Sequence, residues 1–141
     1  MKKKLPKVKT VKTKTWNALS KYVRARDKQC VTCKIEGKWE PATQAGHYRH
    51  NTDKPTQNLG GNELWYNEKN INGQCASCNL YKSGNLVPYA IYMQKTYGDG
   101  ILDEIQALWL KPKKWSREEL KEKEEYFKEK LLTLSTSIST E

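Results

Sequence analysis

The chain has 141 residues, the size of a single domain. Its net charge is +10, and residues 1–28 carry all of this excess, because bases and acids balance in the remainder. No apolar run approaches the roughly 18 residues of a membrane-spanning helix, and no apolar stretch follows the basic start as it would in a secretory signal. The composition argues against membrane and secreted proteins and predicts a cytoplasmic protein with no membrane partner.

Both ends of the chain are poor in apolar residues. Residues 1–15 contain seven lysines and no acid, which predicts a disordered basic arm. Such an arm suits a polyanion, since lysine–phosphate contacts add affinity without reading sequence; the alternative is a solubilising tail. Residues 135–141 are predicted to be a flexible tail. Residues 16–134 form one predicted domain, with a core over 28–98 and a helical part over 99–134.

The predicted elements alternate between helices and short strands. Residues 15–27 carry Trp16, Leu19 and Val23 at helical spacing, which predicts a helix with a basic outer face. Residues 38–48 and 62–66 are predicted strands, separated by a loop-like stretch. Further helices are predicted from about residue 79 to Gly98, over 101–110, and from a Ser116–Glu119 capping box to about 134. This last helix is a scaffold or a partner-binding element.

Two Cys-x-x-Cys pairs give the strongest motif in the chain. Two such pairs can supply four thiolates to a tetrahedral zinc ion, and the pairs are Cys30 with Cys33 and Cys75 with Cys78. Four thiolates leave no open coordination position, so the predicted Zn²⁺ is structural, one per chain, and its binding energy is folding energy. A redox pair or unrelated buried cysteines are the alternatives.

The residues between the cysteine pairs suggest more than a simple zinc ribbon. The pairs are separated by 41 residues, against roughly 15–20 in a ribbon. Both histidines of the chain, His47 and His50, lie in this closed loop. A histidine within a strand is more often structural, but Asn70 follows it and Asn79 comes directly after the last cysteine. This combination of residues favours a catalytic interpretation.

The pattern "GH…N…CxxCN" resembles the HNH, or ββα-metal, nucleases. More specifically, the chain resembles the lambdoid phage NinG (Rap) recombination proteins. That resemblance covers most of residues 16–134 and rests on "KYVRARD", "AGHYR", "YNEKNINGQCASCNLYKSGNLVPY" and "WSREELKEKEEYFKEKLLTL". The ending "CxxCN" is also similar to that of phage endonuclease VII, in which the asparagine binds the catalytic metal.

The resemblance implies both a fold class and an activity. The implied fold is α+β: a zinc-stabilised ββα-metal finger, HNH and treble-clef-like, with a basic N-terminal helix and C-terminal helices. The implied activity is that of a phage endonuclease acting on branched recombination intermediates such as Holliday junctions and D-loops. The implied partners are branched double-stranded DNA, a second copy of the chain as a homodimer, and other recombination proteins.

Three residues receive catalytic roles on this interpretation. His47 is the candidate general base, because an imidazole with a pKa near 6.5 can take a proton from water at neutral pH. Asn79 offers a carbonyl oxygen to a catalytic Mg²⁺ or Mn²⁺ ion. Asn70 corresponds to the middle asparagine of the HNH pattern and is expected to hydrogen-bond the loop that presents His47. Turn formation or helix capping is the alternative for both asparagines.

The chain departs from many HNH enzymes immediately before the base. Those enzymes carry an aspartate there as a second metal ligand, whereas this chain has Gly46, as the NinG resemblance leads one to expect. Glu68 is the favoured replacement because it lies in the NinG-like "NEKN". His50, Asp53, water or a substrate phosphate are the alternatives.

Basic residues around these motifs are the predicted DNA contacts. They should bind phosphates and so position DNA without reading sequence, and they are Arg24, Arg26, Arg49, Lys82, Lys12 and Lys14. Tyr48, Trp65 and Tyr81 are expected either to stack on exposed bases or to lie in the core. The chief rival to the nuclease is a non-catalytic zinc module that binds DNA, and a third possibility is a partner-recruiting protein.

Overall fold

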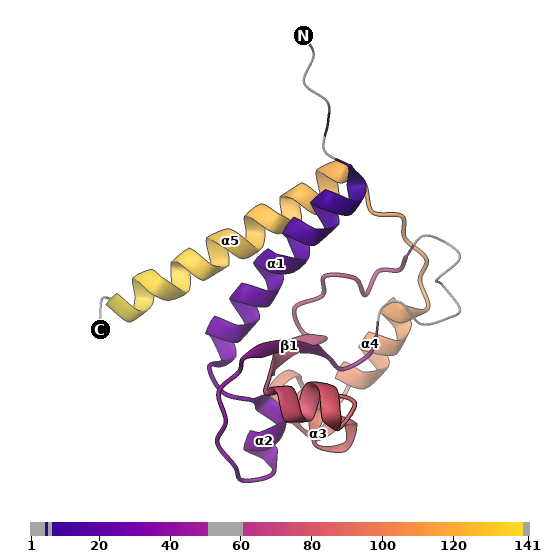
Figure 1. The fold of residues 1–141 in the computed structure, drawn as a ribbon. Helices are drawn as coiled ribbons and strands as arrows, with labels where there is room; N and C mark the ends of the chain where they lie inside the picture. The colour runs from indigo at the N-terminus through magenta and orange to yellow at the C-terminus, as the bar shows by residue number, and fades with distance from the viewer. Residues whose placement is uncertain (1–4, 6, 51–60, 140–141) are drawn as a thin grey trace.

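The computed structural model describes residues 5, 7–50 and 61–139 and combines helices with one small antiparallel sheet (Figure 1). This agrees with the predicted mixed α and β class; the finer HNH assignment stays a prediction. In chain order the elements are α1 (Val8–Asp27), α2 (Val31–Ile35), β1 (Gln44–His47), β2 (Ile71–Gln74), the π-helical turn η2 (Ser77–Tyr81), α3 (Leu86–Tyr97), α4 (Ile101–Trp109) and α5 (Arg117–Ser139).

The two strands pair antiparallel with Gln44 opposite Gln74 and His47 opposite Ile71. Because side chains alternate across a strand, this register divides the sheet into two faces. Positions 45, 47, 71 and 73 share one face, which lies against α1. Positions 44, 46, 72 and 74 share the other, which lies towards η2 and α3. The side chain of His47 therefore points to one face of the sheet, and position 46 belongs to the opposite face.

Helices α1 and α5 lie side by side and run in the same direction (Figure 1). The Thr15 hydroxyl donates to the Leu120 carbonyl at 2.9 Å, and the Tyr22 and Phe127 rings stack at 6.1 Å. Leu120 and Phe127 are fully buried in this core. The apolar face of α5 is thus used within the chain, which supports the scaffold alternative for that helix over the partner-binding one.

The predicted disordered arm is wrong for the described residues from position 8 onward, because α1 begins at Val8. Val11 and Thr15 are buried there, and partly buried Val8 packs against the same cluster. The surface that orders this lysine-rich segment is α5, more than a hundred residues away in sequence. The last helix also extends beyond its predicted end and into the predicted tail, to Ser139.

A second core joins α3 and α4 to the zinc-side helix α2. It contains seven buried side chains: Val31, Leu64, Tyr89, Met93, Ile101, Ile105 and Trp109. The predicted helix over 101–110 is present as α4. The one predicted from about residue 79 to Gly98 begins only at Leu86, because Ser83, Gly84 and Asn85 all take positive φ and separate η2 from α3; α3 ends where Gly98 has a φ of 99°. The capping box is also present: Glu119 N–H donates to the Ser116 hydroxyl, and Ser116 N–H donates to the Glu119 carboxylate.

The two predicted strands are only partly correct. The first is limited to Gln44–His47, and the predicted strand over 62–66 is a series of turns. Leu64 and Tyr66 are both buried, but they enter different cores. Tyr66 has a φ of 62°, which a strand cannot accommodate. The second strand instead lies at Ile71–Gln74. No helix in the described part of the chain has the length and apolar character needed to cross a membrane.

Candidate functional site

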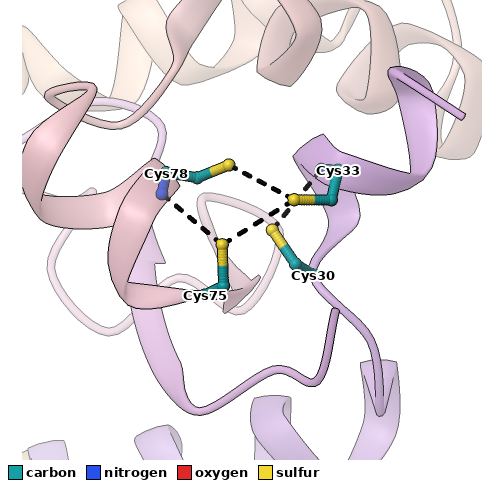
Figure 2. A group of neighbouring side chains, drawn as sticks. All are labelled: Cys30, Cys33, Cys75 and Cys78. Carbon is teal, nitrogen blue, oxygen red and sulfur yellow. Dashed lines mark hydrogen bonds between the residues drawn. The ribbon is translucent and has the colours of Figure 1, made fainter. Parts of the chain in front are cut away.

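The four cysteines converge on one point, as Figure 2 shows. Their sulfurs all lie within 4.8 Å of one another, and none forms a disulfide. Cys33 Sγ is 3.7 Å from Cys75 Sγ and 3.6 Å from Cys78 Sγ. Zinc–sulfur bonds of about 2.3 Å in a tetrahedron separate the sulfurs by about 3.8 Å. The cluster can therefore hold one zinc ion, as the spacing predicted.

Each cysteine pair closes a knuckle in which a backbone amide faces a sulfur. The N–H of Cys33 donates to Cys30 Sγ at 3.4 Å, and that of Cys78 to Cys75 Sγ at 3.5 Å. Burial raises the pKa of the Cys33 thiol, and the neighbouring thiols raise it further. At Cys30 burial acts in the same direction, but hydrogen bonds from Thr32 and Cys33 lower the pKa to about 7. A bound cation would let all four sulfurs carry charge together.

His47 lies on the α1 face of the sheet, next to two other rings. Its imidazole stacks on Trp16 with ring centres 5.0 Å apart and planes within 5°, and the centre of the His50 ring lies 5.8 Å from that of His47. The Nε2 atom is buried and has no hydrogen-bond partner among the described residues. Burial first, and the charge of His50 second, lower the pKa of His47 to about 4. The ring is consequently neutral at pH 7.

Asn79 lies on the other face of the sheet, within η2 and not at a helix start. Its Nδ2 donates to Gln44 Oε1 at 2.8 Å, so the side chain is not the N-cap that was the alternative. Its Oδ1 lies 2.9 Å from the point where a Cβ on Gly46 would stand. Asn79 thus adjoins the residue next to His47 and lies on the opposite side of the sheet from the imidazole. Sequence reasoning placed both groups on one scissile phosphate, whereas the register puts His47 and Asn79 on opposite faces of the sheet.

Asn70 joins the end of β1 to the turn before β2. Its Oδ1 accepts from the Arg49 N–H at 2.9 Å, and its Nδ2 donates to the Arg49 carbonyl at 2.8 Å. Its own carbonyl accepts from the N–H of Tyr48. The fully buried amide therefore holds the backbone directly after His47. This is the geometry expected of a residue that positions the histidine, although its catalytic role stays a prediction.

Glu68 does not lie with Asn79. Its carboxylate accepts a hydrogen bond from the Tyr126 hydroxyl of α5 at 2.8 Å, and its carbonyl accepts from Arg26. The tentative metal ligand thus faces α5, while the Asn79 amide faces Gly46. Asp53, another alternative, lies outside the described residues.

Two predicted phosphate contacts are engaged within the fold. Arg26 pairs with Asp27 at 2.8 Å and also donates to the carbonyl of Ile71 and to Asn72 Oδ1. Burial would lower the pKa of Arg26, but the hydrogen bond and charge of Asp27 raise it above its ordinary value. Arg26 therefore attaches α1 to β2, and its assignment to DNA is corrected.

Arg49 is the second of these residues. Its guanidinium lies 3.7 Å from the centre of the Trp109 ring, a cation–π contact that fixes it against α4. Two other predicted contacts, Lys14 and Lys82, are more accessible than Arg26 and Arg49. Lys14 is exposed, and Lys82 pairs only loosely with Glu36 at 3.9 Å.

The other predicted DNA-facing residues divide in the same way. Arg24 bonds the Ser20 carbonyl of its own helix, and Lys12 lies 4.8 Å from the Trp65 ring. Among the aromatic candidates, Tyr81 is 85% exposed, whereas Tyr48 packs edge-on against Tyr89. Trp65 packs against the α1–α5 core.

Two residues near the site were missed by sequence reasoning as site residues. Trp16 was assigned only to a helical stripe, yet it covers the His47 ring. Gln74 was not singled out, yet its fully buried side chain lies beside Gly46 and Asn79. Its position directly before Cys75 was the available signal, because the residue before a zinc knuckle is held almost as rigidly as the ligand.

Comparison with known proteins finds relatives among bacteriophage proteins. The family described as Bacteriophage Lambda NinG protein matches residues 1–136. The chain is 34% identical over 126 residues to Protein ninG of Salmonella phage P22 and to that of Escherichia phage lambda, covering 86% of this chain and 56% of each relative. Protein ninG of Escherichia phage 933W is 32% identical over 126 residues. The chain spans about half the length of these curated relatives, and no solved structure matches it.

Proposed function

Because the chain belongs to the NinG family of bacteriophage proteins, we propose that it is a metal-dependent endonuclease that cuts branched DNA such as Holliday junctions and D-loops. The substrate class follows from the resemblance of the motifs to recombination nucleases. Shape and bendability of the branch, not base contacts, would select the substrate, because the accessible basic side chains suit phosphates.

One observation carries the proposal. The chain folds residues 44–47 and 71–74 into a hairpin, and the helical turn that follows is fixed by the cysteine cluster. This arrangement brings Asn79 Oδ1 to 2.9 Å from the Cβ position of Gly46, the residue adjacent to His47. A candidate base and a candidate cation ligand therefore belong to adjacent strand positions on opposite faces of the sheet, and the cysteine cluster fixes the side that carries Asn79.

The chain's own groups can be given roles in hydrolysis. His47 is neutral at pH 7, as a general base must be, but burial, which lowers its pKa to about 4, also makes it a weaker base than a free imidazole. Asn70 holds the backbone after His47 and so limits where the ring can turn. Asn79 offers its amide oxygen to Mg²⁺ or Mn²⁺, which when bound would stabilise the charge that develops on the phosphate. Exposed lysines such as Lys14 would hold the DNA backbone.

A second candidate function is supported by a different observation. The Nε2 atom of His47 is buried, and the ring stacks on Trp16 and on His50. Such packing is also what a purely structural histidine would show. On this alternative the protein is a non-catalytic zinc module that binds branched DNA through its basic surface.

Cleavage of a substrate panel separates the two functions. Linear, flapped, D-loop and four-way DNA are incubated with the zinc-loaded protein in Mg²⁺, with and without EDTA. The nuclease should cut branched substrates only when Mg²⁺ is free, while binding persists in EDTA over the time of the assay. Binding of the same substrates without any cleavage, in Mg²⁺ or in Mn²⁺, would overturn the nuclease and leave the DNA-binding module.

A further inference from the structure

The amide of Gln74 has a buried oxygen without a partner. The residue is fully buried, and its Oε1 finds no hydrogen-bond donor among the described residues. A buried carbonyl oxygen without a hydrogen-bond donor is destabilising. Native proteins accept that cost where a water or an ion completes the group. The question is therefore what faces this oxygen.

The orientation of the amide is determined by its other end. Gln74 Nε2 donates to the Gly84 carbonyl at 2.8 Å and to the Thr32 hydroxyl at 3.1 Å. The Gly84 carbonyl can only accept, and the Thr32 hydroxyl lies 3.2 Å from Cys30 Sγ, to which it can give its one proton. Rotating the amide by a half-turn would put two acceptors together. The zinc cluster thus fixes the direction in which Oε1 points.

The oxygen points to the place where a side chain at position 46 would be. A Cβ built on Gly46 would overlap Gln74 Oε1, and Asn79 Oδ1 lies 2.9 Å from the same point. Asn79 is oriented in turn, because its Nδ2 donates to Gln44. Two amide oxygens, each with its nitrogen engaged elsewhere, therefore converge beside Gly46. The missing side chain of residue 46 leaves room for both.

We propose that Gln74 Oε1 and Asn79 Oδ1 together bind the hard divalent cation of this site, with Gln74 supplying the oxygen that Gly46 cannot. This inference rests on the proposed nuclease function. Carbonyl oxygens suit Mg²⁺ and Mn²⁺. Because both ligands are neutral, the free protein should hold the cation weakly, and a DNA phosphate should strengthen its binding. Glu68, which faces α5, is not required.

The first test uses Mn²⁺ and the unaltered zinc-loaded protein. Paramagnetic Mn²⁺ should broaden the side-chain amide resonances of Gln74 and Asn79 before those of other Asn and Gln residues. A four-way junction with uncleavable phosphates should lower the Mn²⁺ concentration needed. Broadening confined to the surroundings of Glu68, or spread evenly over the surface, would overturn the proposal.

The second test measures Mn²⁺ affinity by the electron paramagnetic resonance of the free ion. Gln74→Met keeps the volume and removes the oxygen, and affinity should fall about tenfold or more. Gln94→Met, on the exposed side of α3, is the matched control and should bind like the unaltered protein. Zinc content and thermal unfolding check that each variant folds.

If Gln74→Met is unstable, a double substitution that moves the oxygen ligand from position 74 to position 46 provides the test. Gly46→Asp alone should disturb the two-stranded sheet, because its Cβ collides with Gln74. Gly46→Asp combined with Gln74→Ala should bind Mn²⁺ at least as tightly as the unaltered protein. Unchanged affinity in Gln74→Met would show that the Gln74 oxygen is not a ligand of the cation and would overturn the inference. Junction cleavage by that same variant at the normal rate would leave the proposed function standing, whereas absence of cleavage by the unaltered protein would defeat the function itself.

Discussion

On one face of the two-stranded sheet, His47 is stacked on Trp16 and kept neutral by burial. On the opposite face, Gln74 and Asn79 present amide oxygens beside a residue with no side chain. The first face is attached to α1 by packing and by Arg26, and the second is attached to the zinc cluster. On the proposed function, proton transfer and cation binding would be supported by separate parts of the fold. Adjacent positions 46 and 47 connect them.

Removing zinc should have the largest effect, and it should act on the amide face. Structural zinc contributes about 10–16 kcal/mol of apparent binding energy in small domains, which matches or exceeds a typical stability of about 5–15 kcal/mol. Cys75→Ser, or a strong chelator, should therefore unfold the hairpin and η2. Circular dichroism and hydrogen exchange of residues 71–85 measure this. A hairpin that stays protected without zinc would contradict the assignment.

Arg26→Ala should have the next largest effect, on the face that holds His47. It leaves the buried Asp27 carboxylate without its ion pair and should cost about 3–5 kcal/mol in the free energy of unfolding. Arg24→Ala, two residues earlier and with a single bond to the Ser20 carbonyl, is the control and should cost less than about 1 kcal/mol. Urea unfolding compares the two. Equal losses in the free energy of unfolding for the two variants would show that Arg26 does not attach α1 to β2.

The pH dependence of stability isolates the His47 ring. The unfolded chain binds a proton there with a pKa of 6.5, and the folded protein only at about 4. Between these values the unfolded state holds more protons, so the free energy of unfolding falls as the pH drops from about 6.5 to 4. The loss should be roughly 3 kcal/mol. Urea unfolding of His47→Gln should lack this component, whereas His50→Gln should retain it.

The helices and the zinc cluster could be predicted because their signals are local. Cysteine spacing determines a tetrahedral site wherever the pairs meet, and the Ser116–Glu119 box marks a helix start by itself. Residues 8–15 could not be assigned to a helix, because the surface that orders Val8 and Val11 belongs to α5.

Strand β2 was missed for a similar reason. Its sequence, "INGQ", has little strand propensity, and distant partners hold it in place: Asp27 accepts from the Gly73 N–H, and Arg26 donates to the Ile71 carbonyl. The predicted strand over 62–66 failed because alternating buried residues can also arise from successive turns that feed two cores.

In the candidate site, too, the features predicted correctly have local signals, and the features missed depend on distant residues. His47, Asn70 and Asn79 were proposed from residue type and order, and the structure gives each defined neighbours, although it puts His47 and Asn79 on opposite faces of the sheet. Arg26 and Arg49 were misassigned because a sequence displays charge but not the Asp27 and Trp109 that engage it. Gln74 was missed because a glutamine carries no chemical signal until its oxygen is seen to lack a partner.

The most direct test of the nuclease is a comparison of His47→Ala with His50→Ala on a four-way junction in Mg²⁺. The cleavage rate of His47→Ala should fall by about 10²–10⁴, with junction binding and zinc content unchanged. His50→Ala, which removes a neighbouring exposed ring, should cut close to the normal rate. Normal cleavage by a folded His47→Ala variant would contradict the assignment of the base and leave a protein that holds branched DNA without cutting it through this histidine.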